Sequence, residues 1–154
     1  MRRILSTLYL KFAILLRLIS NASYMKLLLK AYEFRGVVFN GKPEYIHYDS
    51  YLDCSGGLTI GRDVVISTKV IILSHDYSFL KREGYSRDNE CIARNAFRAV
   101  TIGDNCFIGA GAIILPGTTI GHSSIVGAGA VVKGIIEDNS IVVGSPARVI
   151  GKTR

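Results

Sequence analysis

The second half of the chain repeats every six residues. An aliphatic residue returns at this spacing, the residue two positions before it is small or short, and glycine directly follows four of the six aliphatic residues. Six aliphatic hits would arise by accident roughly once in 60 trials, because about half of ordinary residues are apolar. The repeat is therefore a structural signal. The aliphatic residues are Ile102, Ile108, Ile114, Ile120, Val126 and Val132, and the small ones are Val100, Cys106, Ala112, Thr118, Ser124 and Ala130.

The same phase occurs earlier in the chain, at Ile60, Ile66 and Ile72. Extending it backwards predicts inward positions at Tyr48 and Cys54. Residues 74–99 break the pattern, but the phase is kept on their far side. We therefore expect one long excursion from a regular body. Loops of this length inside a compact domain usually have a function.

A period of six fits neither an α-helix nor a hairpin ladder, but it fits a coil with three flat sides. The aliphatic residue then always points inward, and the glycine after it eases the bend between two sides. Successive turns of such a solenoid stack about 4.8 Å apart through backbone hydrogen bonds. Residues 46–72 and 100–144 then supply about four turns, a prism roughly 20 Å tall.

The N-terminal segment has a different pattern. Leu5, Leu8, Phe12 and Leu15 recur at helical spacing within residues 4–19, and a second helix is expected over about residues 22–32, ended by Gly36. Charges interrupt the apolar run before a membrane span accumulates, and no cleavage site of a signal peptide follows. Two interpretations stay open. The helices cap the open end of the solenoid or pack on a neighbouring subunit, or a basic amphipathic helix lies on an anionic membrane surface.

Composition and charge also distinguish the N-terminal helices from the solenoid. The 154 residues suffice for one domain with a hydrophobic core. We expect N-terminal helices over 1–36, the solenoid over 37–144 with its excursion, and a tail over 145–154. Residues 1–35 hold seven basic residues and one acid, so they carry +6 of the formal +7, and the body offers no basic surface for nucleic acid. The three cysteines lack metal-ligand spacing, which favours reduced packing residues and a cytoplasmic protein, with the inner membrane face as an alternative.

The repeat resembles the hexapeptide-repeat acyltransferases, a group that includes the maltose and galactoside O-acetyltransferases. The likeness covers about residues 46–150, and its most specific pieces are TIGDNCFIGAGAIILPGTTIG, VGAGAVVKG and GSPAR. The resemblance implies a mainly β fold, a left-handed parallel β-helix. It also implies acetyl-CoA as co-substrate, no metal, and a homotrimer with sites between subunits.

Three histidines are candidates for catalysis. His47 lies on an early turn and His122 in an outward GHSS turn, whereas His75 opens the long excursion. In the family that the chain resembles, a histidine at this place is the catalytic base, and a neutral imidazole can accept a hydroxyl proton near neutral pH. Asp53 matches an acidic position that the sugar enzymes use near the substrate, and Asp76 is the adjacent alternative as partner of the ring.

The resemblance also implies a place for coenzyme A. The backbone N–H of Ala110 corresponds to the amide that polarises the thioester oxygen, and Ala128 lies one turn further along the side that admits the pantetheine arm. Lys133 and Arg148 match positions that contact its phosphates. For the acceptor we single out Asp76, Tyr77 and Phe107. Phe107 occupies a position where the sugar enzymes often have tryptophan.

These observations predict an O-acetyltransferase that acts on a hydroxyl of a sugar or glycan precursor, as in surface polysaccharide biosynthesis. A xenobiotic or antibiotic acceptor is the near alternative. A trimeric scaffold without catalysis is the alternative of another class. A zinc enzyme of the γ-carbonic anhydrase kind is disfavoured, because its metal needs three histidines including a close pair.

Overall fold

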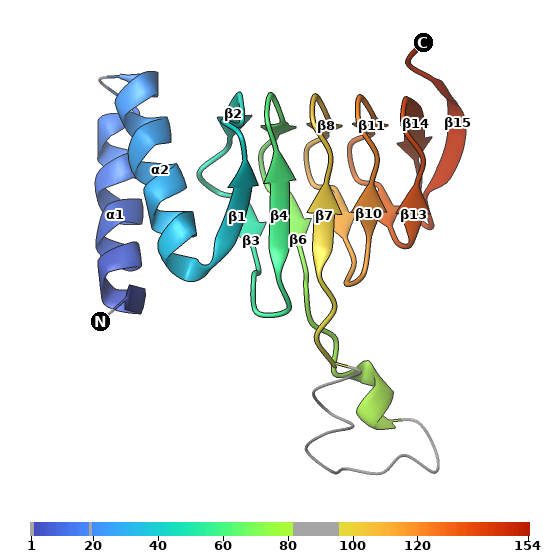
Figure 1. Ribbon diagram of the computed structural model, residues 1–154, viewed down its shortest axis with the longest axis horizontal. Helices are drawn as coiled ribbons and strands as arrows, with labels where there is room; N and C mark the ends of the chain where they lie inside the picture. The colour runs from blue at the N-terminus through green and yellow to red at the C-terminus, as the bar shows by residue number, and fades with distance from the viewer. Residues whose placement is uncertain (1, 19, 82–95) are drawn as a thin grey trace.

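A triangular prism of short strands forms the body of the molecule, with two helices at one end (Figure 1). The computed structural model describes residues 2–18, 20–81 and 96–154. Helix α1 spans Arg2–Leu16 and helix α2 spans Asn21–Arg35. Ser20 caps the start of α2, and Gly36 ends it with a left-handed φ of 101°. Among the described residues, no helix has both the length and the apolar character to cross a membrane.

The strands form three sheets, one for each side of the prism. Sheet A contains β1 (Val37–Asn40), β4 (Leu58–Gly61), β7 (Val100–Ile102), β10 (Thr119–Ile120) and β13 (Ile135–Ile136). Sheet B contains β2 (Tyr45–Ile46), β5 (Val65–Ile66), β8 (Phe107–Ile108), β11 (Ile125–Val126), β14 (Ser140–Val143) and β15 (Arg148–Lys152). Sheet C contains β3 (Tyr51–Leu52), β6 (Ile71–Ile72), β9 (Ile113–Ile114) and β12 (Val131–Val132).

The chain visits the sheets in the order A, B, C and returns to A one turn further along. Neighbouring strands pair in parallel, so each strand lies on its counterpart from the previous turn. The exception is β15, which pairs antiparallel with β14. This arrangement is a left-handed parallel β-helix. The three-sided coil predicted from the six-residue period and the left-handed fold implied by the resemblance are both confirmed.

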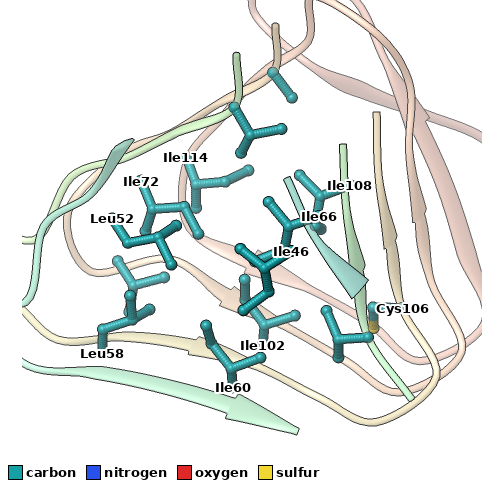
Figure 2. Packing of buried hydrophobic residues seen from close by; sticks show 14 of the residues in the cluster. Ile46, Leu52, Leu58, Ile60, Ile66, Ile72, Ile102, Cys106, Ile108 and Ile114 are labelled. Carbon is teal, nitrogen blue, oxygen red and sulfur yellow. The ribbon is translucent and has the colours of Figure 1, made fainter. Parts of the chain in front are cut away.

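The inward aliphatic residues stack into continuous columns, as the period predicts. Ile60, Ile102 and Ile120 follow one another in sheet A and are at most 1% exposed. Figure 2 shows isoleucines and leucines of the three sheets converging on the interior. A fully buried side chain of this kind contributes about 1.5–3 kcal/mol relative to an exposed one, and the repetition supplies the core.

The first turn departs from the predicted phase. Ile46 pairs with Ile66 and Leu52 pairs with Ile72, so Ile46 and Leu52 are the inward residues. The prediction that Tyr48 and Cys54 point inward is wrong, since both are only partly buried. Two extra residues between Leu52 and Ile60 shift the phase.

The variation in chain length is concentrated at one corner of the prism. From Ile60 onward, inward residues six positions apart lead from sheet A to sheet B, and the same spacing leads from B to C. The corner from C back to A, here called the variable corner, holds residues 53–57, 73–99, 115–118 and 133–134 in successive turns. The inward residues that flank it are 8, 30, 6 and 4 positions apart. The long excursion leaves the prism at this corner (Figure 1).

The glycines of the repeat answer a packing constraint. A Cβ on Gly109 would lie 2.6 Å from the backbone nitrogen of Ala128 in the next turn, and one on Gly103 would lie 2.8 Å from that of His122. Neither glycine has a positive φ. Glycine is therefore needed because adjacent turns approach closely, rather than to ease the bend as the sequence suggested.

Helix α2 covers the N-terminal end of the prism. Tyr24, Leu28 and Tyr32 on this helix are buried, and the Tyr24 hydroxyl donates a hydrogen bond to the carbonyl of Ile46. The Tyr32 hydroxyl donates to the carbonyl of Ser50 at 3.3 Å. These hydroxyls satisfy carbonyls of the first turn, as the end of a solenoid requires. The expected capping of the prism by the helices is thus observed, with α1 on the outer side of α2 (Figure 1).

Candidate active site

His75 lies at the variable corner, where the chain leaves strand β6 for the excursion. It forms an isolated antiparallel bridge with Phe97, so the two ends of the excursion are held together beside the prism. The His75 side chain is 34% exposed. The ring is therefore partly accessible from outside the protein.

Asp53 is the partner of this histidine. Its Oδ2 lies 2.7 Å from His75 Nδ1, and the Ser55 hydroxyl lies 3.1 Å from the same nitrogen. The Asp53 side chain is 8% exposed. A carboxylate beside Nδ1 favours the tautomer with the proton on that nitrogen, which leaves the lone pair of Nε2 to accept another proton.

The surroundings of Asp53 keep its carboxylate ionised. Burial alone would raise the pKa of Asp53, but hydrogen bonds from the backbone amides of Ser55 and Ser74 and from the Ser74 hydroxyl outweigh it. The pKa of Asp53 is therefore held well below its usual range. The two extra residues of the first variable corner place Asp53 and Ser55 against the next turn, where His75 begins the excursion.

The second candidate partner, Asp76, has another role. Its Oδ1 accepts the backbone N–H of Ser78 at 2.7 Å, and its Oδ2 accepts the Ser78 hydroxyl at 3.0 Å. These hydrogen bonds cap the short 3-10 helix η1 (Ser78–Lys81). Among the described residues, Asp53 is therefore the acid that orients His75, while Asp76 stays at the rim of the adjoining pocket.

That pocket opens between the base of the excursion and the next two turns of the variable corner. Lys133, a residue assigned to coenzyme A from sequence, lines it together with His75. Its volume is about 180 Å³, below the roughly 300–1,000 Å³ of ordinary ligand pockets. The pocket of one chain is therefore too small to enclose a coenzyme-sized ligand. The other lining residues are Leu73, Asp76, Arg98, Leu115 and Pro116, of which sequence reasoning had named only Asp76.

Aromatic rings border the histidine on the side of the excursion. The centroids of the Tyr77 and His75 rings lie 5.5 Å apart, and Phe97 packs edge-on against Tyr77 at 6.0 Å. Both aromatic side chains are partly exposed, at 44% and 38%. Tyr77 thus lies where the sequence placed it, and Phe97 joins it. A further aromatic residue of the excursion in the sequence, Tyr85, lies outside the described residues.

The two alanines assigned to coenzyme A lie at another corner, between sheets B and C. Ala110 and Ala128 are each the second residue of a four-residue β-turn, and the two β-turns lie in successive turns of the prism. In each β-turn the N–H of the fourth residue donates a hydrogen bond to the carbonyl of the first, at 3.1 and 3.2 Å. The third residue of each turn has a φ of 67°, which is typical of type II turns. The alanine N–H groups are not used by these hydrogen bonds. Within one chain, they lie on the opposite edge of sheet C from His75.

Two further predicted residues are also distant from the pocket. Phe107 is 44% exposed on the outer face of sheet B. Arg148 begins β15 and is exposed, and it donates to the carbonyl of Ala147 at 2.9 Å. The single chain thus brings together His75, Asp53 and Lys133 with the aromatic border, but not the remaining candidates.

The other two histidines have local partners. His47 contacts the carboxylate of Asp49, and His122 Nδ1 accepts the backbone N–H of Asp104 at 3.0 Å. No group of three acidic, histidine or cysteine side chains suited to a metal ion occurs within the described part of the chain.

Comparisons with known proteins agree with this architecture. Residues 99–133 match the family described as the hexapeptide repeat of succinyl-transferase. WbbJ of Escherichia coli K12, whose name gives it an O-acetyl transferase role in lipopolysaccharide biosynthesis, is 35% identical over 77% of this chain and 62% of its own length. Protein CapG of Staphylococcus aureus is 45% identical over 60% of this chain and 51% of its own. The chain thus spans about half to three fifths of these curated relatives.

Two solved structures show the same fold. The N-acyltransferase AntD from Bacillus cereus, in complex with dTDP and 3-hydroxybutyryl-CoA, is 28% identical with a TM-score of 0.58, over 77% of this chain and 66% of its own. A galactoside acetyltransferase in complex with coenzyme A has a TM-score of 0.63 over 99% of this chain and 81% of its own, at 22% identity. The chain has a left-handed β-helix built on hexapeptide repeats, and it is similar in sequence and fold to acyltransferases that contain this repeat.

The low pKa of Asp53 predicts a pH-dependent contribution to stability. The ionised carboxylate stabilises the fold above the unfolded value of 3.8. This contribution is lost as the pH falls below that value, toward the lower pKa of the folded state. We expect Asp53→Asn to reduce the free energy of unfolding at pH 7 by about 1–3 kcal/mol, with the deficit shrinking below about pH 4. Urea denaturation at several pH values measures it.

The matched control is Asp63→Asn. Asp63 has a side chain that is 67% exposed, so this variant should unfold within about 0.5 kcal/mol of wild type. A deficit for Asp53→Asn that is equal at pH 7 and pH 3 would contradict the low pKa.

Proposed function

We propose that the chain is an acetyl-CoA-dependent O-acetyltransferase that acts on a hydroxyl of a sugar or glycan precursor. The observation that carries the proposal is the His75–Asp53 pair at the variable corner, where the His75 ring lines a pocket at the base of the excursion. An ionised, buried carboxylate on Nδ1 and an accessible Nε2 are the arrangement that a general base requires.

In the proposed reaction His75 Nε2 takes the proton of the acceptor hydroxyl. The hydroxyl oxygen forms a bond to the thioester carbonyl carbon, and the carbon–sulfur bond then breaks. The proton passes from the imidazolium to the departing sulfur, which releases free coenzyme A. Asp53 holds the ring in place and stabilises the transient positive charge.

The developing charge on the carbonyl oxygen needs preorganised donors. The N–H of Ala110 is the donor that we propose, but it lies across sheet C from His75 in its own chain. A trimer in which the variable corner of one subunit faces the turns of its neighbour would unite them. The homotrimer with sites between subunits is part of the proposal, as is binding of the coenzyme A phosphates by Lys133 and Arg148.

The acceptor class is supported by the relatives. WbbJ is named for O-acetyl transfer in lipopolysaccharide biosynthesis, and the border of Tyr77 and Phe97 offers apolar ring faces on which a sugar can stack. We propose a glycan hydroxyl on these grounds. The AntD structures are those of an N-acyltransferase, so the nature of the bond formed must be tested. An ester product is cleaved by neutral hydroxylamine, whereas an amide is not.

Replacement of His75 tests the proposed base. We expect His75→Ala to lower acceptor-dependent release of the coenzyme A thiol from acetyl-CoA by about 10²–10⁴-fold. The fold should be kept, because the ring is partly exposed and lies outside the core. Thiol release is followed with a chromogenic disulfide over a panel of mono- and oligosaccharides, and sedimentation verifies that the assembly is unchanged.

His122→Ala is the matched control. His122 is also on a corner with a side chain 61% exposed, but it lies outside the pocket. This variant should keep wild-type turnover. Activity of His75→Ala within tenfold of wild type would rule out the assignment, and no turnover with any acceptor in the wild type would count against acetyl transfer itself.

We further propose that α1 holds the protein on the inner face of the cell membrane. Ile4, Leu8, Phe12 and Leu15 lie at helical spacing on α1, and each is between 51% and 69% exposed. Residues 1–35 carry a formal charge of +6. An exposed apolar stripe on a basic helix favours the surface of an anionic bilayer.

Two serine replacements on this stripe test the membrane proposal. We expect Leu8→Ser with Phe12→Ser to weaken binding to phosphatidylglycerol-containing vesicles at least tenfold, because each side chain buried in lipid contributes about 1.5–3 kcal/mol. Co-sedimentation measures it. The control pair Val38→Ser and Ile135→Ser, at 53% and 77% exposure on the prism, should bind like wild type. Equal binding by both pairs would contradict the proposal.

A further inference from the structure

A buried serine connects the Asp53–His75 pair to the prism. Ser74 is the residue before His75, and its side chain is 0% exposed. Its hydroxyl donates to Asp53 Oδ2 at 2.8 Å and accepts the backbone N–H of Gly56 at 2.9 Å. Its own backbone N–H donates to the same carboxylate oxygen at 2.9 Å.

These contacts form one chain of hydrogen bonds, from the Gly56 N–H through the Ser74 hydroxyl to Asp53. The Nδ1 atom of His75 lies 2.7 Å from the same carboxylate oxygen. Hydrogen bonds in series polarise one another inside a protein. The strength with which Asp53 holds the Nδ1 proton of His75 therefore depends on how much of its charge the Ser74 hydroxyl takes up.

We infer that Ser74 is a positioning residue that acts on His75 through Asp53. This inference rests on the proposed function, in which His75 is the base. Ser74 takes up part of the carboxylate's charge and thereby moderates its attraction for the imidazolium. It has no contact with substrate in this role.

Two roles of Ser74 predict opposite results. If the hydroxyl takes up carboxylate charge, Ser74→Ala leaves more charge facing Nδ1, and the ring gains its second proton at a higher pH than in wild type. If Ser74 only supports the corner, its loss loosens Asp53 from the ring, and the ring is protonated at a lower pH. Asp53→Asn removes the carboxylate charge altogether, so it shows how far the pH of ring protonation falls when the ring loses this partner.

Other charged groups face His75 besides Asp53. All of them are unchanged in the variants of Ser74, so they affect each titration equally. Among the described residues, the charged groups that line the pocket with His75 are Asp76 on its own segment, Arg98 where the excursion returns, and Lys133 two turns along the prism, and the titratable Tyr77 packs beside the ring.

The experiment is a titration of the imidazole signals by ¹H–¹³C and ¹H–¹⁵N NMR. The chain has three histidines, so the signal missing in His75→Gln assigns the ring. We expect the midpoint to rise by about half a pH unit in Ser74→Ala, to fall in Asp53→Asn, and to stay near wild type in Ser74→Thr, which keeps the hydroxyl. The acid limb of the turnover profile should shift in the same directions, with turnover of Ser74→Ala reduced about tenfold.

Ser124→Ala is the matched control. Ser124 is equally buried, and its hydroxyl joins two turns in the same way, by donating to the carbonyl of Glu137 at 3.1 Å and accepting the N–H of Ser140 at 3.1 Å. It should destabilise the fold as Ser74→Ala does, without moving the His75 midpoint.

An unchanged or lowered midpoint in Ser74→Ala would overturn the inference. The NMR readout needs no acceptor. Failure of the proposed acetyl transfer would therefore appear separately, as absent turnover beside a normal titration.

Discussion

In-register pairing between successive turns is the constraint on which the structure depends. Each strand lies on its counterpart in the previous turn, so an inward isoleucine must fall on an inward isoleucine, as Ile108 does on Ile66. Insertions inside a strand would turn an apolar residue outward and leave a column of the core incomplete. Length can therefore change only between strands, and in this chain most of the change occurs at the variable corner. The protein thereby obtains a place for chemistry without disturbing the core.

The irregularities at that corner are what assemble the site. Two extra residues bring Asp53 and Ser55 against the next turn, and the excursion that follows begins with Ser74 and His75. The corner between sheets B and C keeps its six-residue spacing and carries repeated β-turns whose alanine N–H groups are not used by the hydrogen bonds that close them. The proposed base on one corner and the proposed amide donors on another cannot meet within a single prism. This separation of the proposed groups on different corners is a physical reason for two subunits to form one site together.

Much of the fold could be predicted from sequence, because a fixed period reports which residues point inward. The same reasoning was wrong for Tyr48 and Cys54, since a fixed period cannot reveal two residues added at a corner. Asp53 was found only through a family likeness, and its role beside His75 stays a proposal. Ser74 was missed because it looks like any small residue in the sequence. Its contacts join residues about twenty positions apart, and they exist only when one turn is stacked on the next.

The most direct test of the shared site is complementation between two inactive variants. His75→Ala removes the proposed base. Ala110→Pro removes the proposed amide donor at the second position of a type II turn, where proline is accepted. Co-assembled in equal amounts, the two should regain about a quarter of wild-type turnover, because that fraction of interfaces in a mixed trimer unites an intact base with an intact donor. Turnover that stays at the level of the separate variants would contradict a site shared between subunits.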